Sequence, residues 1–437
     1  MNKLVEAYKN KLAIADQAYG QTHNGAVLSE SKKVMLATLL NNVNKRMNEA
    51  FNGSLATQRS GMGEWKKFCL ALTTVAVPNL IAEELVLTYP MTSIHGYVAY
   101  TKYSYGITKG DAVKGTVIRD AIHGFKNIDP NYTSRAVVET VTAAADVELG
   151  FHPLLNVRLV GAPSGAKVEI LDAETGHVKI TGVSGQVRVA YEYDNEVIPQ
   201  KTIPTLVASI DGISLHAKAR RIGVLYSQMA AYEAKNDYGF DLPDQLSKQA
   251  VGELAYEIDT EVVNLLAENA EFGQGIEFNI ACPVGVGIRD HYVGFLKVIA
   301  DAKTIVYKKT QKVRPNFMVC APDVEACLQV MEAYKASGNE KVMGPYKSGA
   351  LNGMPVFVHP ALEEGTFFLG TNTGDATATA AVFAPYMPII PSSLIDWPDG
   401  STMQGWASMY DLQILNKDLL VAGRIINETQ IVETHAN

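Results

Sequence analysis

The sequence predicts a mixed α+β protein of several structural parts, and three observations support that class. An amphipathic pattern over residues 242–268 predicts one long helix of roughly 40 Å. Residues 155–195 alternate between polar and apolar or aromatic positions, which is typical of strands. Residues 290–385 place short strands, bounded by turns, next to helices. With 47% hydrophobic and 19% charged residues in 437, the chain can bury substantial cores.

The first part of the chain, residues 1–55, is expected to form helices. Apolar side chains recur there at close to helical spacing, and Ser31 can cap the helix that carries them. Such an arm must pack its apolar face on the same chain or on a neighbour. The apolar positions are Val34, Leu36, Leu39, Leu40, Val43 and Met47.

Strand patterns follow at residues 80–105. Four tyrosines lie within nine residues there, but Lys102 is the only basic residue among them, so sheet packing is favoured over a stacking surface for bases. Residues 106–150 contain glycines and few apolar clusters, which indicates an extended excursion with little core of its own. A small β-rich insertion is expected at about 151–200. The four tyrosines within residues 80–105 are Tyr97, Tyr100, Tyr103 and Tyr105.

The long helix predicted over 242–268 has one apolar stripe and one acidic face. Glu253 and Glu257 lie one turn apart and could bind a metal, but no E-x-x-H pattern accompanies them, so a solvated face is favoured. The stripe comprises Leu246, Ala250, Leu254, Ile258, Val262 and Leu265.

Residues 290–385 are expected to form a sheet flanked by helices. After a buried strand at 317–320, Pro322 and Asp323 suit the first turn of a helix. Asn352-Gly353 supplies a turn with positive φ before the strand VFVH, and EEG then turns the chain into TFFLG, so residues 349–370 are expected to form a hairpin. The segments TFFLG and AAVFAP are expected to add further strands to the same sheet.

No established catalytic, cofactor-binding or metal-binding pattern is present, and we predict a protein that is not an enzyme. Ser29 and Lys32 form an S-x-x-K without its usual companions. Asp290-His291 could be half of a catalytic dyad, but such a pair more often opens a helix. His359, in a predicted strand, is expected to be solvated or satisfied by hydrogen bonds.

The composition restricts other possibilities. A net charge of −8 argues against a DNA-binding surface as the main function. Cys69, Cys282, Cys320 and Cys327 show neither C-x-x-C nor zinc spacing, so buried free thiols are favoured. The charged N-terminus does not resemble a signal peptide. Three prolines in TATAAVFAPYMPIIPSSLI argue against a membrane-spanning helix there.

An ordered set of residues resembles the C-terminal half of tailed-phage major capsid proteins, which have the Hong Kong ninety-seven-type fold. Two further segments, AAVFAPYMPIIPSSL and residues 84–100, are similar to T-even-type myovirus capsid proteins, so the likeness covers about two thirds of the chain. The carriers are Ala321, Pro322, Asp323, Leu351, Gly353, Pro355, Val356, Val358, Pro360, Leu362, Gly365 and Thr366.

The resemblance implies a virion protein that assembles with itself, in the host cytoplasm, as hexamers and pentamers of an icosahedral head around double-stranded DNA. It implies scaffolding, portal and decoration proteins as partners, with only weak non-specific contact to DNA and no membrane. The implied parts are an N-terminal arm (1–75), peripheral-domain strands (76–105), an extended E-loop (106–200) with the insertion, a peripheral domain (201–274) whose spine helix is 242–268, an axial domain (275–385), and a return to the peripheral domain (386–437).

The resemblance raises two further properties, proteolytic processing and covalent cross-linking. The prohead protease of T-even-type phages prefers L-x-E, which occurs at 4–6 and 28–30. Covalent cross-linking would need an E-loop lysine, for which Lys109, Lys114 and Lys126 are candidates. The alternatives to a capsid protein are a tail sheath or tube subunit, or a cytosolic α+β enzyme with an unrecognised site.

Overall fold

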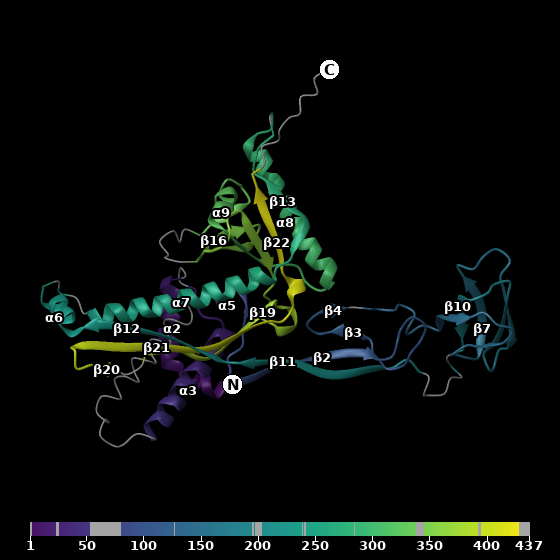
Figure 1. Cartoon of the computed structure of the whole chain (residues 1–437), viewed down its shortest axis with the longest axis horizontal. Helices are drawn as coiled ribbons and strands as arrows, with labels where there is room; N and C mark the ends of the chain where they lie inside the picture. The colour runs from purple at the N-terminus through teal and green to yellow at the C-terminus, as the bar shows by residue number, and fades with distance from the viewer. Residues whose placement is uncertain are drawn as a thin grey trace. The chain divides into compact units, whose positions relative to one another are not determined.

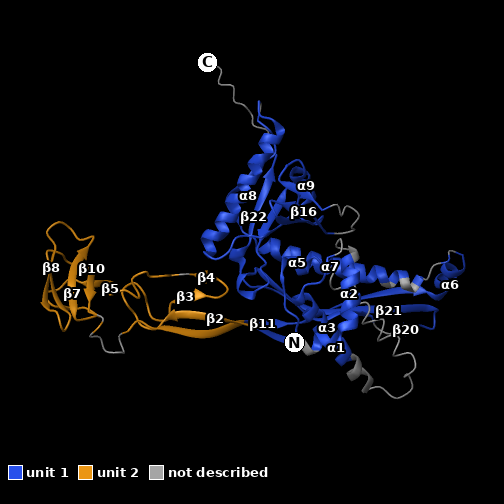
Figure 2. Cartoon of the chain, turned by 180° about the vertical axis from the view of Figure 1, so that it is seen from behind, with its two compact units in different colours: residues 1–98, 213–437 blue, residues 99–212 orange. Residues whose placement is uncertain are grey.

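The computed structural model describes residues 2–22, 26–52, 80–125, 127–194, 196, 203–237, 239, 242–283, 285–337, 345–391 and 395–427 (Figure 1). The chain divides into two compact units, and both helices and sheets are present, so the predicted α+β class is confirmed. Unit 1 comprises residues 1–98 and 213–437, and unit 2 comprises residues 99–212 (Figure 2). Unit 2 is therefore an insertion in the chain of unit 1.

Three N-terminal helices of unit 1 share a small apolar core. They are α1 (Asn2–Ala7), α2 (Lys9–Thr22) and α3 (Glu30–Asn52), as the helical pattern predicted. The cap prediction was wrong by two positions, because Ser29 Oγ, and not Ser31, accepts a hydrogen bond from the Lys32 amide. The buried members are Leu12, Ala15, Leu28, Met35, Leu36, Ala37, Leu39, Leu40 and Val43.

A five-stranded sheet with α7 on one face forms the base of unit 1. The helix spans Leu242–Asn269, which confirms the long helix of the sequence pattern, and Figure 1 shows it lying along β12 and β21. The sheet order is β1-β19-β21-β12, and β20 pairs with β21. The strands are β1 (Leu87–Thr88), β12 (Lys218–Ser227), β19 (Ala381–Pro391), β20 (Ile395–Asp396) and β21 (Ser401–Ile414).

A second, seven-stranded sheet of unit 1 has the order β13-β22-β18-β14-β17-β16-β15. The predicted turn with positive φ is confirmed, with φ of 49° at Asn352 and 80° at Gly353, and it joins β16 to β17. The strands are β13 (Phe272–Asn279), β14 (Phe317–Cys320), β15 (Tyr334–Ala336), β16 (Tyr346–Leu351), β17 (Met354–Val358), β18 (Thr366–Gly370) and β22 (Val421–Ile426). The helices are α5 (Ala82–Leu85), α6 (Gln228–Asp237), α8 (Ile288–Thr310) and α9 (Pro322–Gln329), with 3-10 turns η3 (Ala376–Ala378) and η4 (Lys417–Leu419).

Two strand assignments from the sequence were wrong. The segment AAVFAP does not join TFFLG in one sheet, because it forms β19 of the five-stranded sheet. The strands VFVH and TFFLG do not form the hairpin expected over 349–370, because β14 lies between β17 and β18 and pairs with both. In β19 the pairing register shifts after Pro385, since a proline cannot donate to the ladder.

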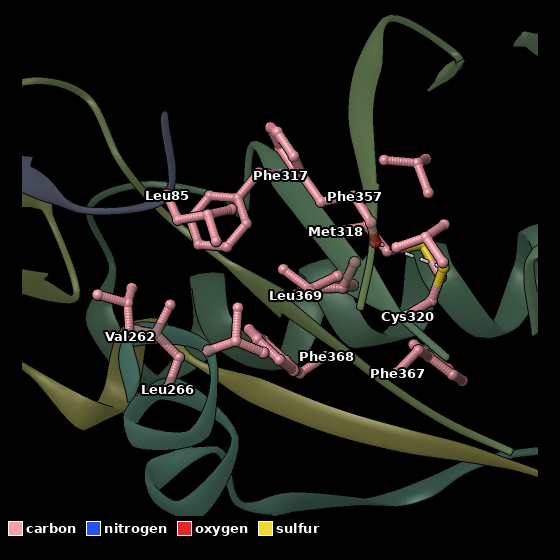
Figure 3. Packing of buried hydrophobic residues seen from close by; sticks show 14 of the residues in the cluster. Leu85, Val262, Leu266, Phe317, Met318, Cys320, Phe357, Phe367, Phe368 and Leu369 are labelled. Atoms are coloured by element: carbon pink, nitrogen blue, oxygen red, sulfur yellow. Dashed lines mark hydrogen bonds between the residues drawn. The ribbon is translucent and has the colours of Figure 1, made fainter. Parts of the chain in front are cut away.

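One hydrophobic core connects α7, α8 and both sheets of unit 1. Figure 3 shows Val262 and Leu266 of α7 near Phe368 and Leu369 of the seven-stranded sheet. The predicted stripe is buried at its centre and half-buried at its ends, Leu246 and Leu265. Cys320 is fully buried in this core and Cys327 is buried, whereas Cys282 is partly exposed and Cys69 lies outside the described residues.

Unit 2 contains a long two-stranded ribbon and a small β-rich part. The ribbon strands β2 (His95–Tyr105) and β11 (Leu206–His216) form a sheet with β3 (Val117–Asp120) and β4 (Gly124–Phe125), in the order β11-β2-β3-β4. The β-rich part has two sheets, β5-β10-β7 and β6-β9-β8. Its strands are β5 (Ala136–Thr142), β6 (Val147–Glu148), β7 (Leu154–Val160), β8 (Lys167–Asp172), β9 (His177–Thr181) and β10 (Gln186–Tyr193).

The β-rich part begins earlier than the sequence indicated. Val137 and Leu149 lie in its core, so the stretch 106–150 is not an excursion without a core along its whole length. The alternation in β10 was predicted correctly, because Val187, Val189 and Tyr191 are buried. The strand β5, AVVETVT, lies within that stretch and belongs to this part.

We predict that Leu254→Ala lowers the free energy of unfolding by about 2–5 kcal/mol, because Leu254 is 1% exposed at the centre of the α7 stripe. Glu253→Ala, on the exposed face, is the control and should change it by less than about 0.5 kcal/mol. Chemical denaturation of both variants measures the difference. Equal stability of the two variants would contradict the assignment of the stripe.

Candidate assembly interface

The outer strand of the ribbon in unit 2 exposes apolar side chains. Within the described residues β11 lies at an edge of its sheet and pairs on one side, with β2. Leu206, Val207 and Ile210 of this strand are 57%, 50% and 78% exposed. An edge strand with exposed apolar residues offers both unpaired backbone groups and apolar area to another chain. This strand is the first candidate for a contact between proteins.

Polar contacts hold the ribbon together. The Lys102 ammonium forms an ion pair with Asp211 across the two strands. The Gly106 amide donates to the Thr205 carbonyl at 2.7 Å. A Cβ at Gly106 would lie 2.3 Å from Thr205 Oγ1, so this close approach requires glycine. The exposed apolar residues therefore stand on a defined strand pair.

Lys109 is buried where the chain leaves the ribbon. Its side chain has only 2% exposure, and its ammonium donates to the carbonyl oxygens of Asn131 at 3.2 Å and Tyr132 at 2.9 Å, and to that of Ser134. It also lies 5.0 Å from the centre of the Tyr193 ring. Burial lowers the pKa of Lys109, and the charge of Asp129 acts in the opposite direction. All three donors of the ammonium are thus used to join neighbouring loops.

This placement bears on the lysines named for cross-linking. Lys109 is occupied by backbone carbonyls and shielded from solvent, so it does not present a free amine to another chain. Lys114 is exposed. Lys126 lies outside the described residues. Of the three candidates, Lys114 is the one that the described structure leaves accessible.

Asp290, His291 and His359, which the sequence offered as possible functional residues, have structural roles. Asp290 lies in the first turn of α8, and His291 Nε2 lies 2.7 Å from the carbonyl oxygen of Asn279, to which it donates. His359 is fully buried, and its Nδ1 accepts from the Ala361 amide at 3.2 Å. Its Nε2 lies 3.2 Å from Thr260 Oγ1, and burial lowers its pKa. It is therefore a satisfied core histidine, one of the two outcomes that the sequence allowed.

The remaining named side chains do not converge on a site. Glu253 and Glu257 are exposed on α7. In the S-x-x-K pattern, the Lys32 ammonium contacts Glu83 and not the Ser29 hydroxyl. Among the described residues, no group of three or more His, Cys, Asp or Glu side chains could hold a metal ion. In the same part of the chain, no helix combines the length and apolar character needed to cross a membrane.

Sequence reasoning missed a cluster of buried carboxylates between the N-terminal helices and the core. Asp259 of α7 is 7% exposed and accepts hydrogen bonds from the amides of Ala82 at 2.9 Å and Ile81 at 3.3 Å. The Glu83 side chain is 1% exposed, and the Lys32 ammonium lies 3.2 Å from its Oε2. The cluster therefore connects α3, α5 and α7.

Burial raises the pKa of both carboxyl groups. The pKa of Glu83 is about 7, because desolvation outweighs the attraction of Lys32. The pKa of Asp259 is about 6, because desolvation outweighs the hydrogen bonds from Ala82 and Ile81. Asp259 could have been suspected from the sequence, since it interrupts an apolar row of α7 between Val251 and Val263. Glu83 has no comparable local signal.

Comparison with known proteins identifies the family. The family model described as "Major capsid protein Gp23" matches residues 62–430, which is most of the chain. The chain belongs to the Gp23 family of major capsid proteins. Membership of this family confirms the prediction of a capsid protein and excludes the alternative of a tail sheath or tube subunit. The chain is therefore a virion component, and its copies assemble with one another.

A curated relative agrees with this assignment. The major capsid protein of Vibrio phage KVP40 is 21% identical over 386 residues, which cover 78% of this chain and 74% of the relative. Solved structures that are similar include one from Microbacterium phage Oxtober96 (13% identity, TM-score 0.35) and the capsid of Myoviridae phage XM1 (10% identity, TM-score 0.35). Each of these covers 70% of this chain and 90% of the solved chain. At such TM-scores we base no conclusion on them.

We predict that Lys109→Met destabilises unit 2 of the capsid protein by about 1–3 kcal/mol, because it leaves buried carbonyl oxygens without a donor. Lys114→Met, at an exposed lysine six residues before Asp120, is the control and should have little effect. Hydrogen exchange of residues 131–134 measures the difference locally. Equal protection of these amides in both variants would contradict the bridging role.

We predict a pH dependence of stability that Glu83→Gln removes. Since the pKa of Glu83 rises on folding from 4.5 to about 7, the folded state binds the proton more tightly. Its stabilising contribution is complete below pH 4.5 and is lost as the pH rises to 7, by roughly 3 kcal/mol.

Chemical denaturation between pH 4.5 and 7.5 measures this effect as the difference between wild type and Glu83→Gln. The variant should gain stability over wild type as the pH rises. Glu253→Gln, at an exposed position, is the control and should follow wild type. Parallel curves for wild type and Glu83→Gln would show that Glu83 is not desolvated.

Proposed function

We propose that this chain forms hexamers and pentamers that close into an icosahedral head around double-stranded DNA, and that assembly takes place in the host cytoplasm. The observation that carries the proposal is the membership of the Gp23 family, together with the exposed edge of β11. The role is structural, and we propose no catalytic activity. Scaffolding, portal and decoration proteins are the proposed partners in addition to the chain itself.

We also propose how the parts of the chain divide this work. Unit 2 is assigned as the E-loop with its β-rich insertion, and α7 as the spine helix of a peripheral domain built on the five-stranded sheet. The seven-stranded sheet with α8 and α9 is assigned as the axial domain, and the helices before residue 53 as the N-terminal arm. The core that α7 shares with both sheets supports this division, and the N-terminal helices have a separate core of their own.

The ribbon is the proposed contact with a neighbouring copy. An exposed apolar edge is costly in an isolated subunit, because water surrounds Leu206, Val207 and Ile210. A neighbour that covers these side chains and pairs with the free backbone removes that cost. Each contact is small, but a closed shell contains many copies of it. The negative net charge of −8 is consistent with only weak contact to the packaged DNA.

Negative-stain electron microscopy of the purified chain tests the proposed function. We expect closed shells, whereas tubes as the only product would favour a sheath subunit. A species that remains a small oligomer at all concentrations would contradict self-assembly. The enzyme alternative predicts a small oligomer that has a defined active site.

We predict that Ile210→Lys leaves the subunit folded but prevents shell formation, since it places a charge on the most exposed apolar residue of β11. Leu171→Lys, at a 52% exposed position of β8 in the β-rich part, is the matched control and should still assemble. Sedimentation velocity and a thermal melt of the same preparations report assembly and folding separately. Normal shells from Ile210→Lys would show that this edge is not covered by a neighbour.

A further inference from the structure

One face of the five-stranded sheet in unit 1 has an open groove. α7 packs on the opposite face, where Trp406 and Tyr410 are buried. Because side chains alternate along a strand, the residues between them point to the other face. There they line a groove of about 450 Å³ with parts of β12, β19 and α3. The β21 members are Met403, Gly405, Ala407 and Met409, together with Trp406 between them.

The strand register divides the groove into rows. Gly223 of β12 pairs with Gly405 of β21, and the Met403 side chain lies over Gly223, where a Cβ would be 2.4 Å from Met403 Cε. Met403 pairs with Leu225 on one side and with Ile395 on the other. Paired residues share a face of the sheet, so these three form an apolar row at one end. They are 36%, 64% and 52% exposed, in the order given.

The other end of the groove is basic. Arg221 of β12 pairs with Ala407, and the Arg46 guanidinium of α3 lies 3.4 Å from Met387 Sδ. Both arginines are exposed, and among the described residues neither forms an ion pair with a carboxylate. Two guanidinium groups therefore stand beside an apolar hollow.

This combination specifies the chemistry of an occupant. The methionines Met387, Met403 and Met409 accept apolar side chains and adapt to different shapes. The arginines require carboxylates at one end of the same segment. A nucleic-acid backbone would satisfy the arginines but would leave the row of Leu225, Met403 and Ile395 uncovered. From Met403 to Met409 the groove runs for roughly 20 Å, which matches a short strand.

We propose that a second copy of this chain places an apolar, acidic segment in this groove. The proposal rests on the proposed function, because copies of a capsid protein are its neighbours in the shell. It is also supported by charge complementarity. Each copy has a net charge of −8, so it carries carboxylates in excess, while the groove presents two arginines that lack acidic partners.

Photo-cross-linking from the groove identifies the occupant directly. A benzophenone amino acid replaces Met403, and isotopically heavy and light preparations of the full chain are mixed before assembly. We expect cross-links between heavy and light copies, onto a segment that contains Asp or Glu. Cross-links within one copy only, or none between copies in any assembled species, would overturn the proposal.

Charge reversal provides an independent test. Arg46→Glu combined with Arg221→Glu should raise the concentration needed for half-maximal assembly at least tenfold. The control is Lys308→Glu combined with Lys335→Glu, which makes the same change in net charge at exposed positions outside the groove. It should change the concentration needed for half-maximal assembly less than twofold. A thermal melt establishes that each variant is folded.

The two experiments separate the groove from the function it rests on. If wild type forms shells and the groove variants assemble normally, the groove proposal is wrong and the capsid function stands. If wild type forms no shells, the proposed assembly is wrong, and the cross-link between copies in the remaining oligomers still decides whether the groove is a contact. Displacement of the cross-link by a DNA duplex would identify a nucleic-acid contact and overturn the proposal.

Discussion

The packing of α7 between two sheets is the constraint on which unit 1 depends. Rows of apolar residues on this helix contact the five-stranded sheet and the seven-stranded sheet within one core. Among the described strands, those of one sheet do not pair with those of the other, and the helix joins the two sheets through this core. The same helix holds the start of α5 through Asp259, whose carboxylate accepts hydrogen bonds from the amides of Ile81 and Ala82. A stiff helix of this length is suited to a subunit that must keep its shape under the load of a closed shell.

Unit 2 is stabilised by different means. Its apolar clusters are small and local, and Lys109 replaces part of a core by joining three backbone carbonyls beside aromatic rings. A buried ammonium is tolerated because every one of its donors is satisfied. The ribbon itself then needs little apolar burial within the subunit. Its apolar residues on β11 can therefore remain at the surface, where another chain can reach them.

The sequence predicted the features that depend on local pattern. The 3.6-residue period identified α3 and α7, and Asn352-Gly353 identified a turn with positive φ, a conformation that this pair of residues favours. It failed where partners lie far apart in the chain. Nothing within AAVFAP shows that it pairs with β21, and nothing around Lys109 shows that it is buried. The groove is equally invisible, since it brings Gly223 next to Gly405.

Charged residues beside the exposed apolar surfaces determine which partners those surfaces can accept. An uncharged apolar edge would pair with any similar edge, and that is how sheet proteins aggregate. On β11 the apolar residues lie next to the Lys102–Asp211 pair, and in the groove they lie next to Arg46 and Arg221. In the groove, a partner without carboxylates would desolvate Arg46 and Arg221 without compensation, which lowers its affinity. The apolar area thus supplies affinity, and the adjoining charges supply the discrimination that an ordered shell requires.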